Sequence, residues 1–311
     1  MARSGAMVLV ALLACTMPAP ASAAGSLYAG PAADPLFTTI MPRLLTALFP
    51  DQRLDGMEAA DSVVALGRVA GDASSAALVD LAAMVNFIAA KKLPPERLEF
   101  HGSIGAHCLL GFARRDGWVR SFGDIAATDG TPRPRIGLAG PDAVVLSGIL
   151  RQIDPRLAGV AFKAGTADEG AAQVVAGTSD LLLLVAQPDL DRALIQRLAD
   201  NDQLVLLPVA TRLLLRAAVD RSSGFILQPV QSDSGLTPWS RRPVTTLCSP
   251  TGVVIRADAP AALRDAVNRA VPVVAASLEI SLVDQALGAA RGTMNDALDG
   301  VQGLIGRFRS R

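Results

Sequence analysis

This sequence of 311 residues contains few of the side chains that build active sites and metal centres. It has 3 cysteines and 2 histidines, and aromatic residues make up only 4% of it. His101 and His107 would face the same side if their segment is a strand, but no cysteine or further histidine stands near them at metal-ligand spacing. We therefore predict no metal site and interpret both histidines as structural.

Motifs of catalysis and cofactor binding are also missing. The chain has no Gly-x-Ser-x-Gly and no Gly-Lys-Ser/Thr after a strand, and residues 137–140 supply only two glycines of a dinucleotide fingerprint. The aspartates that open predicted helices are interpreted as caps of backbone N–H groups: Asp142, Asp168, Asp189 and Asp191. We predict neither a catalytic residue nor a cofactor, so the protein is not expected to be an enzyme.

An excess of charge of either sign is absent too. The 29 basic and 29 acidic residues cancel, which argues against a nucleic-acid surface, because phosphate binding needs Lys and Arg in excess on one face. Half of the residues are hydrophobic, as in a soluble α/β protein. The partner is expected to be a small molecule or a protein.

Residues 1–23 have the features of an export signal. Arg3 supplies positive charge, residues 7–14 form a short apolar core, and residues 21–23 (Ala-Ser-Ala) fit a cleavage site. In an alternative interpretation the signal is that of a lipoprotein, and Cys15 becomes the lipidated first residue. Either way the sequence predicts a periplasmic protein, and no other apolar run is long enough to span a bilayer.

Strands and helices alternate through the central stretch, residues 135–188. Short apolar runs predict strands at 135–139, 159–163 and 180–186, and apolar residues at helical spacing predict helices at 142–153 and 167–176. Such alternation indicates a parallel sheet, and open parallel sheets bind ligands at the carboxyl ends of their strands. The loops expected to bind a ligand are therefore residues 140–142, 164–166 and 187–189.

Similar units on either side predict a second, discontinuous lobe. Residues 26–29 and 53–59 are expected strands, residues 35–49 and 61–69 are expected helices, and residues 76–83 are an apolar run. Residues 108–116 and 252–258 are both apolar runs that end in Arg and Asp, so we interpret them as strands that leave the first lobe and return to it. The predicted division is residues 24–112 for the first part of lobe I, 113–247 for lobe II, 248–274 for the return to lobe I, and 275–311 for a tail.

The tail is expected to be an amphipathic helix. Apolar residues from Val283 to Phe308 recur at steps of three and four. This stripe would pack either on its own lobe or against a partner.

Several segments resemble TAXI-type solute receptors of tripartite (TRAP) transporters. The carboxyl half carries the resemblance in residues 202–209, a following helix, residues 224–230, and residues 252–258 with their helix. Upstream, residues 118–125, 136–141 and 174–181 are also similar. The likeness covers roughly residues 26–274, mostly in the order of elements.

The resemblance implies the fold and a function. It implies a two-lobed periplasmic-binding-protein fold with two hinge strands, which captures a small organic solute and delivers it to membrane transporter subunits, as a monomer. The ligand contacts expected from loop position are Tyr28, Gly30 and Ala32 in lobe I, and Gly140, Asp142, Thr166 and Gln187 in lobe II.

Two loops depart from the family pattern. The glycine-rich and hydroxyl-bearing loops of the family correspond here to residues 29–34 and 140–144, which contain Ala, Pro and Val instead. A buried carboxylate ligand would lack donors there, so the expected solute is less polar than a dicarboxylate. The alternatives are a periplasmic adaptor or degenerate receptor that acts through its tail helix, and an enzyme on the same scaffold.

Cleavage of the export signal leaves Cys108 and Cys248 in an oxidising compartment. They stand at the two expected crossing strands, which lie side by side in receptors of this kind, so one disulfide between them is possible. Two buried free thiols are the alternative.

Overall fold

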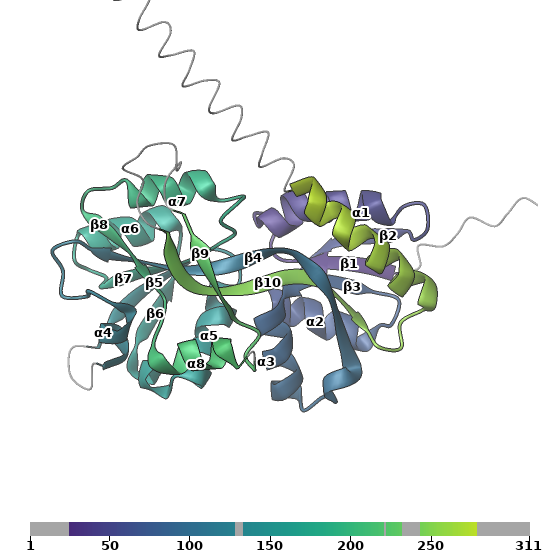
Figure 1. Cartoon of the computed structure of the whole chain (residues 1–311), viewed down its shortest axis with the longest axis horizontal. Helices are drawn as coiled ribbons and strands as arrows, with labels where there is room; N and C mark the ends of the chain where they lie inside the picture. The colour runs from purple at the N-terminus through teal and green to yellow at the C-terminus, as the bar shows by residue number, and fades with distance from the viewer. Residues whose placement is uncertain (1–24, 128–132, 221, 232–242, 279–311) are drawn as a thin grey trace, which may run out of the picture.

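The computed structural model describes residues 25–127, 133–220, 222–231 and 243–278. The predicted export signal, and the predicted tail from residue 279 onward, lie outside the described residues. Two bodies stand side by side and are joined by two long strands that run through both (Figure 1). This confirms the predicted two-lobed α/β fold.

The described strands belong to one curled sheet of ten. Its order is β2-β1-β3-β10-β4-β7-β5-β6, with β8 paired to β4 and β9 paired to β10. The strands are β1 (Gly25–Ala29), β2 (Leu54–Glu58), β3 (Ala76–Asp80), β4 (Leu98–Arg114), β5 (Arg135–Ala139), β6 (Ala161–Ala164), β7 (Leu181–Ala186), β8 (Leu204–Pro208), β9 (Ile226–Val230) and β10 (Val244–Arg256).

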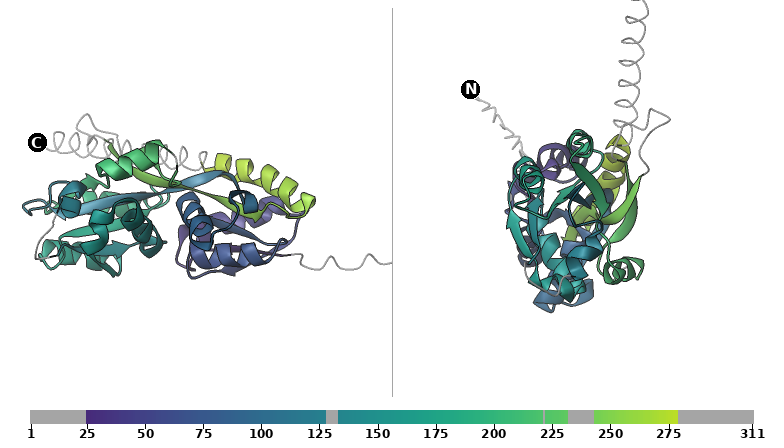
Figure 2. Two further views of the ribbon diagram at one scale, coloured as in Figure 1. Left: turned by 90° about the horizontal axis from the view of Figure 1, so that it is seen from below. Right: turned by 90° about the vertical axis from the view of Figure 1, so that its left-hand side faces the viewer.

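Helices cover both faces of this sheet (Figures 1 and 2). The α-helices are α1 (Met41–Leu48), α2 (Ser62–Gly71), α3 (Leu81–Lys91), α4 (Phe122–Ala127), α5 (Ala143–Ile153), α6 (Ala167–Val175), α7 (Arg192–Ala199) and α8 (Arg212–Val219). The shorter turns are the π-helix η1 (Leu36–Ile40) and the 3-10 helices η2 (Pro95–Arg97) and η3 (Pro155–Gly159). A last helix occupies residues 261–278.

Each lobe has a parallel group of strands, and the two groups meet at β4 and β10. In lobe I, β1 pairs in parallel with β2 and β3; in lobe II, β5 pairs in parallel with β6 and β7. Strand β4 pairs with β10 from Leu98 to Cys108 and with β7 from Cys108 to Ala113. The passage between lobes therefore lies inside β4 and β10, close to Cys108.

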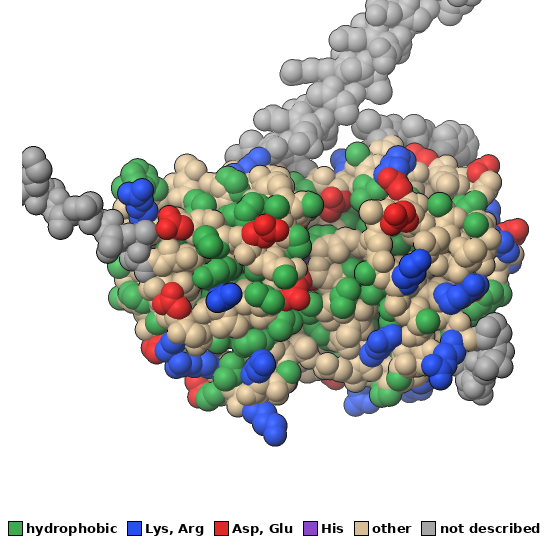
Figure 3. Space-filling model, turned by 180° about the vertical axis from the view of Figure 1, so that it is seen from behind, with side chains coloured by type: hydrophobic (Ala, Val, Ile, Leu, Met, Phe, Trp, Pro, Cys, Tyr) green, Lys and Arg blue, Asp and Glu red, His purple; other side chains and the backbone are tan. Residues whose placement is uncertain are grey.

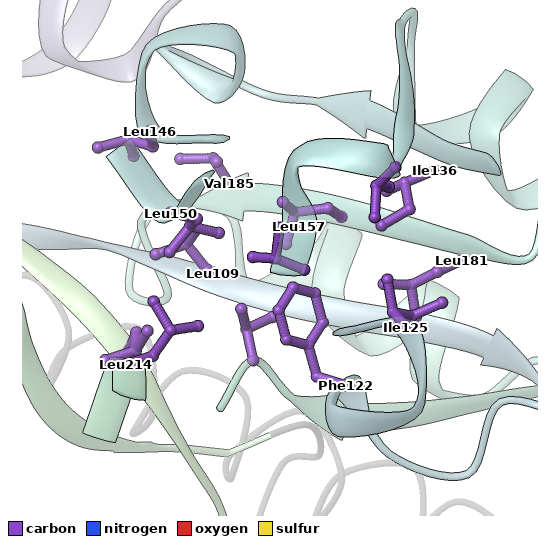
Figure 4. Close-up of a cluster of buried hydrophobic side chains, with 14 of the residues drawn as sticks. Leu109, Phe122, Ile125, Ile136, Leu146, Leu150, Leu157, Leu181, Val185 and Leu214 are labelled. Atoms are coloured by element: carbon purple, nitrogen blue, oxygen red, sulfur yellow. The ribbon is translucent and has the colours of Figure 1, made fainter. Parts of the chain in front are cut away.

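Each lobe has its own hydrophobic core. In lobe II, helices α4, α5 and α8 pack on β4, β5 and β7, and Leu109, Leu150 and Leu181 are fully buried among them (Figure 4). In lobe I, Leu263, Val267 and other apolar residues of the helix at 261–278 pack with α1 on the sheet, and Figure 2 shows that helix lying along lobe I. Burial of this kind contributes about 25 cal/mol per Å² of apolar surface removed from water.

Some element boundaries differ from the predictions. The apolar run at 76–83 is a strand that ends at Asp80 followed directly by α3, because an unbroken apolar run does not reveal where a strand changes into a helix. Strand β6 begins at Ala161 because residues 155–159 form η3, and β10 begins at Val244, well before the predicted run. Strand β8 pairs antiparallel with β4 rather than joining the parallel group.

The two hinge strands are joined by a disulfide between Cys108 and Cys248, with an S–S distance of 2.04 Å. Their Cα atoms are 3.9 Å apart, closer than the separation of about 4.4–6.8 Å usual for disulfides. The two residues are direct cross-strand partners in the β4–β10 register. Within the described ranges, no helix is both long enough and apolar enough to cross a bilayer.

Candidate functional site

A set of polar side chains from both lobes meets where the hinge strands pass between them. We call it the junction cluster, and its members are Asp34, Asp80, His107, Asp142, Gln187 and Asp191. Asp34 and Asp80 follow or end the parallel strands β1 and β3 of lobe I, whereas Asp142, Gln187 and Asp191 follow β5 and β7 of lobe II. The site thus lies at the carboxyl ends of parallel strands, the position expected for a ligand.

His107, on β4, is at the centre of the cluster. Its Nδ1 lies 3.0 Å from Asp80 Oδ2 and 3.2 Å from Asp80 Oδ1, and neither side chain is accessible to solvent. Burial alone would lower the pKa of His107, but the charges of Asp80, Asp34 and Asp142 together with the hydrogen bond to Asp80 raise it to about 9. His107 is therefore an imidazolium at neutral pH, and its Nε2–H has no hydrogen-bond partner among the described residues.

Asp34 is folded back under its own loop. Its Oδ1 accepts a hydrogen bond of 2.8 Å from the Leu36 N–H, and a side chain at Gly30 would overlap its carboxylate. The residue is only 4% exposed. Burial raises the pKa of Asp34, and the neighbouring charges of Asp80 and Asp191 raise it further, while His107 lowers it.

Asp142 connects the two lobes. Its Oδ1 accepts a 2.9 Å hydrogen bond from the backbone N–H of Ser62, the first residue of α2, and its Oδ2 accepts one from the Ser62 hydroxyl. The predicted role of Asp142 as a cap of its own helix is wrong, because its side chain makes no cap bond to α5. It lies in the left-handed region, at φ 51°, directly after the turn at Gly140 (φ 96°). Burial, with the charge of Asp80, raises the pKa of Asp142 to about 6.

Gln187 and Asp191 complete the cluster on the lobe II side. The Gln187 N–H donates a 2.8 Å hydrogen bond to Asp191 Oδ2, so Asp191, which makes no side-chain cap bond to α7, was also wrongly predicted as a cap. The Gln187 carboxamide lies directly against the backbone of Gly105, where any side chain would overlap its Nε2. Gln187 is 2% exposed, and within the described ranges neither its Oε1 nor the nearby Thr251 Oγ1 has a hydrogen-bond partner.

The predicted contact residues fall into two groups. Gly30, Asp142 and Gln187 lie in or against the junction cluster, and Gly140 forms the turn that presents Asp142. The others have contacts elsewhere: Tyr28 packs on the lobe I core, the Ala32 N–H bonds Glu58, and Thr166 caps α6 in a capping box. The role of all seven in ligand binding remains a prediction.

Sequence reasoning missed Asp80, His107 and Asp191 as site residues, and Asp34 was not among the ligand contacts that it named. One signal was available, since an aspartate at the end of, or just after, a predicted parallel strand points to a ligand edge. The two histidines have separate partners. His101 Nδ1 bonds Asn268 of the last helix at 2.8 Å, whereas His107 bonds Asp80; the β4–β10 register shifts between them, and they do not form one site.

Two further features lie apart from the junction cluster. A pocket of about 350 Å³ on lobe II is lined by residues of β5, β6 and the end of α6, including Arg135, Lys163 and Gln173, and no predicted contact residue lines it. On the face drawn in Figure 3, acidic, basic and apolar side chains are intermixed over both lobes. In the part of the chain that the structure describes, no group of three or more potential metal ligands converges on one point.

Comparison with known proteins finds only distant structural similarity. No protein-family model matches the chain, and no curated protein matches its sequence. A solved structure titled as a periplasmic transporter has 14% identity and a TM-score of 0.47, with 82% of each chain covered. The substrate binding protein of an amino acid ABC transporter has 12% identity and a TM-score of 0.47, covering 84% of this chain and 98% of the other.

A TctC solute binding protein from Polaromonas is similar to the same degree. Its identity is 13% and its TM-score 0.45, with 84% of this chain and 88% of the other covered. Similarities this distant carry no argument about function. The function is therefore inferred from the geometry of the chain itself.

Proposed function

We propose that the protein is an extracytoplasmic receptor that binds one small organic solute between its lobes and presents it to a membrane transporter. The observation that carries the proposal is the junction cluster, which takes polar side chains from both lobes and places them at the hinge strands. A solute bound there would contact both lobes, so its binding energy would favour the closed arrangement over an open one.

The contact between Ser62 and Asp142 supports this proposal. It joins the start of α2 in lobe I to the turn before α5 in lobe II, and Val145 of α5 packs against the lobe I core next to it. These groups would separate if the lobes opened. A transporter subunit that contacts both lobes could therefore distinguish the closed receptor from the open one.

The extracytoplasmic location is part of the proposal. It is supported by the disulfide between Cys108 and Cys248, since such bonds persist in oxidising compartments, and by the export-like composition of residues 1–23. Within this proposal, the TAXI-type TRAP system is the transporter class that the sequence resemblance favours.

Thermal denaturation in the presence of a solute library tests the receptor function. A solute at 100 times its dissociation constant should stabilise the protein by about 2.7 kcal/mol. Asp142→Asn should weaken that stabilisation, whereas Asp168→Asn, on the exposed start of α6 where it pairs with Arg197, should leave it unchanged. If no amino acid, amine, carboxylate or sugar stabilises the protein, or if both variants respond like the wild type, the receptor proposal fails.

A second candidate function is favoured by the buried Asp80–His107 pair. The His107 Nδ1 contacts the Asp80 carboxylate, and the His107 Nε2–H has no partner in the described part of the chain. This is the geometry of an oriented proton donor, and a bound substrate could receive a proton from it. NMR of each stabilising solute during incubation with the protein would detect turnover. Conversion that disappears in His107→Gln would establish an enzyme, whereas unchanged solute over many hours would exclude it.

A further inference from the structure

The junction cluster has an excess of negative charge. It contains four carboxylates, two from each lobe, and one imidazolium. The charge of His107 lowers the pKa values of Asp34, Asp142 and Asp191, and His107 forms an ion pair with Asp80. Buried carboxylates are unfavourable unless cations or hydrogen-bond donors surround them, so this arrangement favours the arrival of positive charge.

The position in the junction that is best suited to an anion is already occupied. The N-terminus of α2 presents the Ser62 N–H and hydroxyl, and a helix N-terminus attracts negative charge. Both donors are bonded to the carboxylate of Asp142 from the other lobe. An anionic solute would have to displace this carboxylate and would then lie among the remaining acids.

Independent evidence for a ligand comes from Gln187. Its side chain is buried, lies against Gly105 and Thr251 at the hinge, and is linked through its own N–H to Asp191. Its Oε1 accepts no hydrogen bond from any described residue. Leaving a buried acceptor unpaired costs about 1–3 kcal/mol. A ligand that donates an N–H or O–H hydrogen bond to this oxygen would remove that cost.

A metal ion is a poorer candidate than an organic cation. The described residues contain no group of three or more His, Cys, Asp or Glu side chains close enough to hold a metal. Separated carboxylates are better suited to an organic cation. Ammonium and guanidinium groups carry several N–H donors that point in different directions and can each bind a carboxylate.

We propose that the solute is a small organic cation, bound through an ammonium or guanidinium group by Asp34, Asp191 and the Gln187 Oε1. This inference rests on the proposed receptor function and names the chemical class of its ligand.

Calorimetry with three compounds of equal chain length tests the ligand class. Putrescine, 1,4-butanediol and succinate share four carbons and carry ammonium, hydroxyl and carboxylate ends. Putrescine, with agmatine as a guanidinium-bearing companion, should bind at least tenfold more tightly than butanediol, and succinate should bind more weakly than either cation. Succinate or butanediol binding as tightly as the cations would overturn the inference.

Two variants locate the effect at the junction. Asp191→Asn keeps an acceptor for the Gln187 N–H but removes the charge, and should weaken putrescine or agmatine binding about tenfold or more, because a charge-assisted hydrogen bond is lost. Gln187→Met, of similar volume, should weaken it by a similar factor. Asp168→Asn should change nothing, and circular dichroism would confirm that all three variants are folded.

The outcomes separate this inference from the receptor function itself. If neither cation binds, but an anionic or neutral solute of the wider library binds and Asp142→Asn weakens it, the receptor stands and the cationic ligand is excluded. If no compound of the library binds, both proposals fall. Cation binding that is the same in Asp191→Asn as in the wild type would exclude the junction as the cation site.

Discussion

The lobe II core and the centre of the junction cluster are both hidden from water, yet they are built from opposite chemistry. Around Leu150 and Leu181 the core is apolar and filled by side chains from α4, α5, α8 and the sheet (Figure 4). The junction buries Asp80, His107 and Gln187 to the same extent, and polar atoms of the last two have no partner among the described residues. Burial stabilises the first region and opposes folding in the second, which is the pattern of a site kept for binding.

The largest expected effect comes from the disulfide that links the two hinge strands. Replacing both cysteines, Cys108→Ala with Cys248→Ala, opens a loop with a sequence separation of 140 residues. The loop-entropy relation gives a loss of about 5 kcal/mol in the free energy of unfolding. Urea denaturation of the oxidised wild type and the double variant measures it, and a difference under about 1 kcal/mol would show that the bridge does not constrain the unfolded chain.

Truncating a core side chain should be the next most damaging change. Leu150 of α5 is fully buried, and Leu150→Ala should lower the free energy of unfolding by roughly 3–5 kcal/mol through lost transfer energy and the cavity left behind. Leu150→Met, of similar volume, should cost less than about 1.5 kcal/mol. Equal losses in the two variants, again by urea denaturation, would contradict the view that packing governs this region.

The junction cluster should make the free energy of unfolding depend on pH. The folded pKa of His107 is about 9, above its unfolded value of about 6.5, so the folded state holds its proton more tightly. The protonated His107 therefore contributes at most roughly 3 kcal/mol to the free energy of unfolding. This contribution is complete below pH 6.5 and is lost as the pH rises to 9.

Unfolding free energies measured at several pH values between 6 and 10 test this expectation. The double variant Asp80→Asn with His107→Gln replaces the ion pair by neutral groups and should remove the alkaline decline. A decline that persists in the double variant would assign it to other groups.

The smallest effect on stability is expected for Asp191→Asn. Burial raises the pKa of Asp191, which means that the folded protein disfavours its ionised form, and asparagine can still accept the Gln187 N–H. The free energy of unfolding at pH 7 should stay constant or rise by less than about 1 kcal/mol. A loss of more than about 1 kcal/mol in thermal denaturation, with Asp168→Asn as the reference, would show that this carboxylate supports the fold rather than a ligand.

The sequence predicted the order of elements well where periodicity was clear. Strand β5 has the predicted bounds, and α5, α6 and β7 differ from their predictions by one residue at a single end. The predictions were weaker where an apolar run had no period, as at the change from β3 to α3. The strand-end rule pointed to the edge at which the junction cluster lies, but the roles of Asp142 and Asp191 were read from their own helices alone.

The sequence by itself determined the alternation of strands and helices, the two lobes and the pairing available to its cysteines, because these follow from local periodicity and a short inventory of residues. Only the tertiary structure decided which aspartates share a site. Asp34 and Asp142 are 108 positions apart in the sequence, and Asp142 bonds Ser62 across the lobes rather than its own helix. The charges that raise the pKa of His107 likewise come from the strand ends and loops of both lobes, and no local pattern encodes how these segments meet.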